Sequence, residues 1–185
     1  MFDKIKPAVA LFAITFFFAF ALGFVHDITL SPIEAQKAKN EAETVSSLVP
    51  GVEETASFTV DDGTEVKKII ECYGGSEIVG HAVVVEPKGY GGPIELMVAF
   101  GTDGSINGAM VLSHTETPGL GSLAALPAFT DLFVNKTGRF AVVKSNANAD
   151  ANEIQAITSA TITTEAVVRG VNAAVEYFEV NIWRR

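Results

Sequence analysis

Five hydroxyl side chains lie within seven residues near the end of the chain, directly before a segment that is predicted to be helical. They belong to Thr158, Ser159, Thr161, Thr163 and Thr164. The first turn of a helix has backbone N–H groups without intrahelical partners and carries a partial positive charge. Such a helix start can bind a phosphate group, and neighbouring hydroxyl groups can add hydrogen bonds to it. The alternative is an ordinary N-cap, which needs only one of the five hydroxyls.

A second motif that could contribute to a binding site is the segment 114–121, with the sequence HTETPGLG. It follows a predicted strand and therefore lies at the end of a sheet, where binding residues are often found. Pro118 and the two glycines give a shaped loop that a ligand can approach closely. A flat ring could pack against Leu120. The alternative is a simple strand-to-helix turn in which Glu116 is solvated.

No other pattern in the sequence indicates catalysis or metal binding. A Ser-His-Asp set, a metal-ligand cluster, a P-loop and a Rossmann fingerprint are all missing. The single Cys72 cannot form an internal disulfide and is expected to be a packed strand residue. The net charge of −9 at pH 7 argues against nucleic acid and anionic lipid headgroups as partners.

An apolar segment near the N-terminus predicts a membrane anchor. Residues 7–25 contain no charged side chain and one hydroxyl, that of Thr15. In a helix these residues span about 28 Å, which is close to the thickness of the bilayer core. A soluble helix would need a polar face, which this segment lacks. We therefore expect a transmembrane helix over residues 7–26.

The basic residues around this segment predict its orientation. Lys4 and Lys6 precede it, and the next basic residue after it is Lys37. The positive-inside rule then predicts a cytoplasmic N-terminus over residues 1–6 and an exported body. The alternative is a signal peptide cleaved after Ala21, which would release a soluble exported protein.

The rest of the chain divides into a short polar segment and one larger domain. Within residues 27–50, Ser31 resembles an N-cap, Pro32 suits the first helical position, and Glu34 completes a capping box. This pattern predicts a stalk or docking helix that begins at Ser31. Residues 51–185 are predicted to form a single domain.

Four segments of this domain are rich in Val and Ile, are bounded by Gly, Pro or Asp, and are therefore predicted to be strands. They are residues 67–73, 78–86, 94–100 and 105–114. Residues 101–104 form a hairpin turn between the last two. Residues 140–145 are a further strand candidate, and residues 123–133 are a short helix candidate that Pro127 interrupts.

Residues 163–177 are predicted to form an amphipathic helix. Its apolar stripe consists of Val167, Val171, Ala174 and Phe178. Glu165 is placed in the first turn, where the helix dipole favours it. The stripe should dock on the sheet and hold the Thr161 region in place. The predicted architecture is an α+β domain with a mostly antiparallel sheet and flanking helices.

The chain resembles the FMN-binding subunits of ion-pumping redox complexes. These are the G subunits of Rnf complexes and, more distantly, the C subunits of sodium-translocating NADH:quinone oxidoreductases. The resemblance covers nearly the whole chain, including the N-terminal span, the motif 115–121 and the segment 158–161. It also includes the loop 89–94 (GYGGPI), whose glycines could allow close approach to a ligand or to another backbone segment, or could form a plain turn.

The resemblance implies that FMN is attached through its phosphate to Thr161. The family's attachment pattern has an Asp, two further residues, Ser or Thr, usually Gly, then Ala and Thr, and a flavin transferase joins the last Thr to FMN. Here Gln155 stands in place of the Asp, and Ser159 stands in place of the Gly. The implied cofactor-binding residues are Thr158, Ser159, Ala160, Thr161, Thr163, Thr164, Glu116, Thr117, Gly119, Leu120 and Gly121.

The resemblance further implies a membrane-anchored electron carrier in a Rnf-type ferredoxin:NAD⁺ oxidoreductase complex that translocates Na⁺ or H⁺. The chain would have no substrate turnover of its own. Its partners would be the other membrane and redox subunits and the flavin transferase, and its FMN domain would lie on the extracytoplasmic side. The alternative is a non-redox exported binding or assembly module of the same fold, in which Gln155 and Ser159 prevent covalent attachment of flavin.

Overall fold

The computed structural model describes residues 2–145, 147–148 and 152–183, which form two compact units, Met1–Ala42 and Glu43–Arg185. The first unit is helical and belongs to α1 (Phe2–Leu48), which continues into the second unit. Within α1, the 20 residues Ile5–Phe24 have a mean hydropathy of 2.2 and are not buried. In the described part of the chain, this is the one helix long and apolar enough to cross a membrane. The predicted N-terminal apolar helix is thus confirmed.

The helix start predicted at Ser31 is wrong, because α1 passes through this position without a break. A capping pattern starts a helix only where the preceding chain is not helical. Here the preceding turns are already formed, and each added residue extends a helix more easily than a new helix can nucleate. The boundary between a span over residues 7–26 and a stalk over residues 27–50 stays a prediction.

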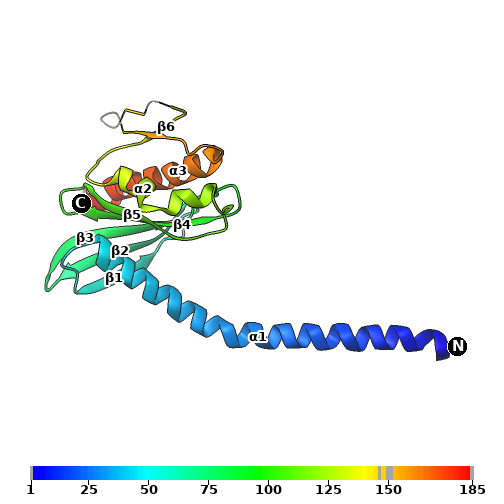
Figure 1. Cartoon of the computed structure of the whole chain (residues 1–185). Helices are drawn as coiled ribbons and strands as arrows, with labels where there is room; N and C mark the ends of the chain where they lie inside the picture. Colours follow the sequence, from blue (N-terminus) through cyan, green and yellow to red (C-terminus); the bar gives the residue numbers. More distant parts are fainter. Residues whose placement is uncertain (1, 146, 149–151, 184–185) are drawn as a thin grey trace. The chain divides into compact units, whose positions relative to one another are not determined.

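The second unit is built on a five-stranded antiparallel sheet with the strand order β1-β2-β3-β4-β5 (Figure 1). Its strands are β1 (Glu54–Thr59), β2 (Val66–Gly74), β3 (Glu77–Val85), β4 (Ile94–Gly101) and β5 (Ile106–His114). The four predicted strands are confirmed as β2 to β5, with ends that differ by at most one residue. Strand β1 was not predicted, because it is an edge strand whose side chains are almost all exposed.

The remaining elements are short helices, one small sheet and the long helix α3. They are η1 (Gly121–Ala125), α2 (Pro127–Thr130), η2 (Asp131–Phe133), β6 (Ala141–Val143), β7 (Glu153–Gln155), α3 (Thr161–Phe178) and η4 (Glu179–Trp183). The predicted helix over residues 123–133 is therefore three short segments, and Pro127 begins the middle one. Helix α3 starts earlier than predicted, at Thr161, so that Glu165 lies beyond its first turn.

The five-stranded sheet is buried on both faces, because successive side chains of a strand point in opposite directions. In β4, Leu96 and Val98 belong to one core, whereas Met97 and Ala99 belong to the other. The first core is covered by α3, and all four residues of its predicted apolar stripe are buried there. The stripe therefore docks on the sheet as predicted.

The last turn of α1 covers the opposite face of the sheet. Val45 and Val49 are buried in this second core. Glycines of the sheet allow the close packing: a Cβ on Gly80 would lie 2.9 Å from a methyl of Val49, and a Cβ on Gly108 would lie 2.6 Å from a methyl of Leu48. Real Cβ atoms do not approach this closely, so a side chain at Gly108 would displace the Leu48 side chain, and one at Gly80 would also meet the Phe100 carbonyl oxygen at 2.8 Å.

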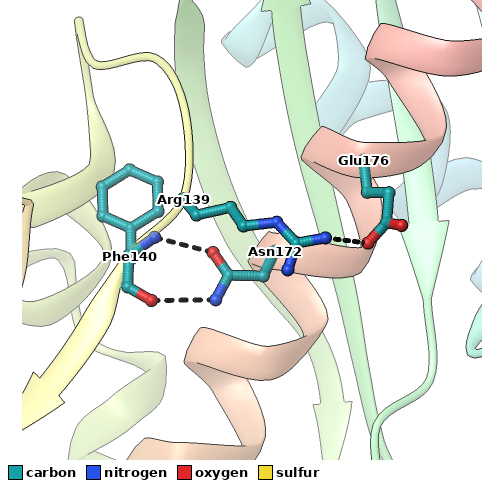
Figure 2. Close-up of polar contacts among 4 residues, drawn as sticks. All are labelled: Arg139, Phe140, Asn172 and Glu176. Atoms are coloured by element: carbon teal, nitrogen blue, oxygen red, sulfur yellow. Dashed lines mark hydrogen bonds and ion pairs between the residues drawn. The ribbon is translucent and has the colours of Figure 1, made fainter.

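Helix α3 also holds the small sheet, in which β6 pairs with β7 in parallel. The Asn172 amide on α3 accepts a hydrogen bond from the Phe140 N–H (2.8 Å) and donates one to the Phe140 carbonyl (2.9 Å) (Figure 2). Arg139 pairs with Glu176 about one turn further along α3 (Figure 2). Because β7 leads directly into the hydroxyl-rich segment, these contacts help to position the start of α3.

Candidate cofactor site

A cavity of about 540 Å³ lies at the N-terminus of α3. It is lined by Tyr90, Glu116, Thr117, Leu120, Gly121, Ser159, Ala160, Thr161, Ile162 and Thr163. Three segments that are far apart in the sequence thus meet here: the glycine loop before β4, the segment after β5, and the start of α3. Cavities of roughly 300–1,000 Å³ are of the size that holds small molecules and cofactors.

The first turn of α3 has no side-chain cap. Its N-cap is Ala160, and its first internal hydrogen bond runs from the Thr164 N–H to the Ala160 carbonyl (3.0 Å). In the described part of the chain, no group accepts a hydrogen bond from the N–H groups of residues 161–163. An anion in the cavity would meet these donors and the positive end of the helix dipole. The ordinary N-cap interpretation of the hydroxyl run is therefore wrong.

The threonine hydroxyls of α3 have different surroundings. Thr161 is half-buried and lines the cavity, and no described residue forms a hydrogen bond with its hydroxyl. The Thr163 hydroxyl donates to Oε2 of Glu116 (2.6 Å). Thr164 is fully buried, and its hydroxyl donates to a backbone carbonyl one turn earlier (3.0 Å) and accepts from the Ile157 N–H (3.1 Å). Thr161 therefore presents the helix hydroxyl that is available to a ligand.

Thr158 and Ser159 precede the helix and are both exposed, but only Ser159 lines the cavity. Ser159 has a φ of +65°. This left-handed conformation favours glycine, because a Cβ crowds the following carbonyl. The backbone at this position therefore favours glycine over the serine that is present.

Glu116 joins the three segments of the site. Its side chain lines the cavity and is 6% exposed, which is unusual for a charged residue. Its Oε1 accepts a hydrogen bond from the Gly91 N–H (2.9 Å), and its Oε2 accepts the one from Thr163. The interpretation of Glu116 as a solvated turn residue is therefore wrong, because the carboxylate is buried and fastens the glycine loop to α3.

Glycines make room for this carboxylate. A Cβ on Gly89 would lie 2.4 Å from Oε1 of Glu116, and a Cβ on Gly121 would lie 2.5 Å from Oε2. A Cβ on Gly91 would lie 2.3 Å from the Thr115 carbonyl oxygen. The loop that holds Gly89 and Gly91 thus approaches another backbone segment closely, as one of the alternatives for this loop predicts.

Of the residues that the resemblance implies, Glu116, Thr117, Leu120, Gly121, Ser159, Ala160, Thr161 and Thr163 line the cavity. Thr158, Gly119 and Thr164 do not. Gly119 has a φ of +76° and shapes the turn instead. Tyr90 and Ile162 also line the cavity and were not predicted. Tyr90 lies within the glycine loop, and its place in that loop could have identified it as a candidate. Ile162 is an ordinary apolar residue, and nothing in the sequence marks it as part of a site.

Among the residues that line the cavity, Glu116 is the one charged side chain, and no Lys, Arg or His takes part. The exposed side chains of Tyr90, Leu120 and Ile162 offer apolar surface. No group of three or more His, Cys, Asp or Glu side chains that could hold a metal ion is found among the described residues. The arrangement suits an organic ligand with a flat apolar part and an anionic group.

Comparison with known proteins points to the same region of the chain. Residues 89–176 match the FMN-binding domain family, and this range contains every residue that lines the cavity.

Two known proteins illustrate the similarity along the length of the chain. It is 37% identical over 187 residues to the G subunit of the proton-translocating ferredoxin:NAD(+) oxidoreductase complex of Clostridium ljungdahlii, and the match covers 94% of each chain. It is 31% identical over 192 residues to the G subunit of the Na(+)-translocating complex of Acetobacterium woodii, with 94% of this chain and 91% of that one covered.

Among solved structures, the fold is similar to the C subunit of the Na(+)-translocating NADH-quinone reductase of Parabacteroides distasonis. The TM-score is 0.56 at 21% sequence identity, and the match covers 75% of this chain and 81% of that chain. At this identity the similarity concerns the fold alone. It agrees with the predicted α+β architecture with a mostly antiparallel sheet.

Proposed function

The chain belongs to the family of G subunits of Rnf-type ion-translocating ferredoxin:NAD⁺ oxidoreductase complexes, and we propose that it binds FMN in the cavity at the start of α3 and relays electrons within such a complex. The sequence resemblance to this family is confirmed by relatives that match nearly the whole chain. The chain is one part of an oxidoreductase, and the other subunits of the complex are its partners.

One observation carries the proposal: the uncapped start of α3 and the available hydroxyl of Thr161 face the same cavity. The free N–H groups of residues 161–163 suit the phosphate of FMN, because each is a hydrogen-bond donor near the positive end of the helix. Tyr90, Leu120 and Ile162 offer contacts to a flat ring. Bound FMN would supply the electron chemistry, and this chain would hold and orient it.

We further propose that a flavin transferase attaches FMN to Thr161 through a phosphoester. Thr161 matches the last residue of the family's attachment pattern, and its hydroxyl forms no hydrogen bond with any described residue. The Ser159 hydroxyl is the competing candidate, because it also lines the cavity. A covalent bond would keep the cofactor on a domain that faces away from the cytoplasm.

The proposed orientation is a cytoplasmic N-terminus, an anchor over residues 7–26, and an FMN domain on the extracytoplasmic side. The apolar helix supports the anchor, and Lys4 and Lys6, which precede residue 7, support the orientation. A C-terminal alkaline phosphatase fusion tests the orientation, since this enzyme needs the disulfides of an exported compartment. An inactive fusion that is present at normal levels would contradict it.

Peptide mass mapping of the denatured chain from its native membrane, with in-gel ultraviolet fluorescence, tests the flavin site. We expect a fluorescent band and the mass of FMN, less water, on the peptide that contains Thr161. Thr161→Ala should lose this flavin while circular dichroism stays unchanged, and Ser159→Ala should keep it. Flavin retained by Thr161→Ala would contradict the attachment site. A dark wild-type band at the unmodified mass would favour noncovalent FMN or the non-redox alternative.

A further inference from the structure

Glu116 places a buried negative charge in the wall of the proposed flavin cavity. Its side chain is 6% exposed, and both of its oxygens accept hydrogen bonds. The Gly91 N–H can only donate, and the Thr163 hydroxyl is able to donate, so both contacts suit an ionised carboxylate. An ionised carboxylate at this position would hold its charge in a place that excludes most water.

The groups around this carboxylate do not neutralise it. Its two donors are the Gly91 N–H and the Thr163 hydroxyl, which carry no formal charge. No ion pair involves Glu116 within the described residues, and no basic side chain lines the cavity. The partial charge of the α3 terminus is the positive feature on this side of the site.

We propose that the Glu116 carboxylate lowers the reduction potential of the flavin in this cavity, an inference that rests on the FMN site proposed above. One-electron reduction of bound FMN would take an electron from a reduced redox centre of a partner subunit, which would thereby be oxidised. It would add one unit of negative charge to the cavity unless a proton from water accompanied the electron. A nearby buried carboxylate repels this added charge with little screening by solvent, and so favours the oxidised cofactor.

The contacts of Glu116 allow the effect of its charge to be tested separately from its structural role, which is to join the glycine loop to α3. Gln has nearly the same shape: its amide oxygen can accept from the Gly91 N–H, and its amide nitrogen can donate to the Thr163 hydroxyl oxygen. Glu116→Gln therefore removes the charge and keeps both contacts. Glu116→Asp keeps the charge but shortens the side chain, which weakens the contacts.

Glu165→Gln is the matched control for a change in net charge. Glu165 lies on α3 and is exposed, and it lines a different cavity, together with Arg139 and Arg169. Water screens an exposed carboxylate, so its removal should change the potential much less than the removal of Glu116.

The experiment is a reductive titration of the full-length flavinylated chain with dithionite and indicator dyes. Relative to the wild type, Glu116→Gln should favour one-electron reduction about tenfold, which corresponds to a potential about 59 mV higher. Glu116→Asp should stay close to the wild type, although its contacts are weaker. A role in folding alone predicts the opposite order, with Gln close to the wild type and Asp changed.

An unchanged or lower potential in flavin-loaded Glu116→Gln, or a rise no larger than in Glu165→Gln, would overturn the inference and leave the proposed function standing. Loss of flavin in Glu116→Gln with retention in Glu116→Asp would also overturn it, because the charge would then be needed to hold the cofactor. A wild-type chain without any flavin would instead overturn the proposed function, and the inference with it.

Discussion

Replacing Ser159 by glycine should stabilise the domain, although the change removes a side chain. Ser159 has a φ of +65°, and this conformation costs a residue with a Cβ about 1–2 kcal/mol. Glycine adopts it freely but loses more chain entropy on folding, which costs about 0.5–1 kcal/mol. No described residue forms a hydrogen bond with the Ser159 hydroxyl, so no hydrogen bond is lost. The difference predicts a gain of about 0.5–1 kcal/mol in the free energy of unfolding.

The gain can be measured by urea and thermal unfolding of the full chain without flavin. For a chain of this size, it corresponds to a melting temperature roughly 1–4 °C higher. Asn135→Gly is the matched control: Asn135 is exposed and has a φ of +58°, but asparagine tolerates this conformation better than serine does. Its gain should be clearly smaller. A Ser159→Gly variant that gains no more than this control would refute the reasoning.

Three other predictions concern the packing of α3 and the sheet. Asn172→Ala leaves the Phe140 N–H and carbonyl without their side-chain partner and should lower the free energy of unfolding by about 2–3 kcal/mol. Urea denaturation measures this loss, and an unchanged unfolding midpoint would contradict the prediction. Burial lowers the pKa of His81 from its ordinary value of 6.5, so below that pH the unfolded chain binds more protons and stability falls. His81→Phe should reduce the fall measured between pH 7 and pH 5, and an equal fall would refute this cause. Burial raises the pKa of Cys72 to about 11, so the native thiol should resist an aromatic disulfide reagent at pH 8 and react after denaturation; rapid labelling of the native chain would contradict its burial.

The strands β2 to β5 could be predicted because their own residues carry the signal. They are runs of Val and Ile between turn residues, and each is buried on at least one face. Strand β1 could not be predicted in this way, since its exposed side chains show no apolar pattern and it forms by pairing with β2. The wrong helix start at Ser31 has a related cause, because a local capping pattern does not report whether the preceding chain is already helical.

The candidate site was partly predictable from two local motifs, but its internal contacts were not. Glu116 contacts Gly91 across 25 residues and Thr163 across 47 residues of sequence. No local pattern records such a contact, so the same glutamate was compatible with a solvated turn. The hydroxyl run raises the same difficulty, because spacing alone cannot tell which threonine is engaged by a neighbour and which one faces the cavity.

The burial of the end of α1 has a practical consequence for cutting the chain. Val45 and Val49 are 1% and 0% exposed, so the last turn of this helix is part of the globular core. A fragment that begins at residue 51 would open the far face of the sheet to water, including Ile70 and Met97, and should aggregate. A fragment that begins at Glu43 should stay monomeric in detergent-free buffer. A fragment without the anchor should therefore be soluble only if the chain is truncated between Phe24 and Thr44, well before the first strand.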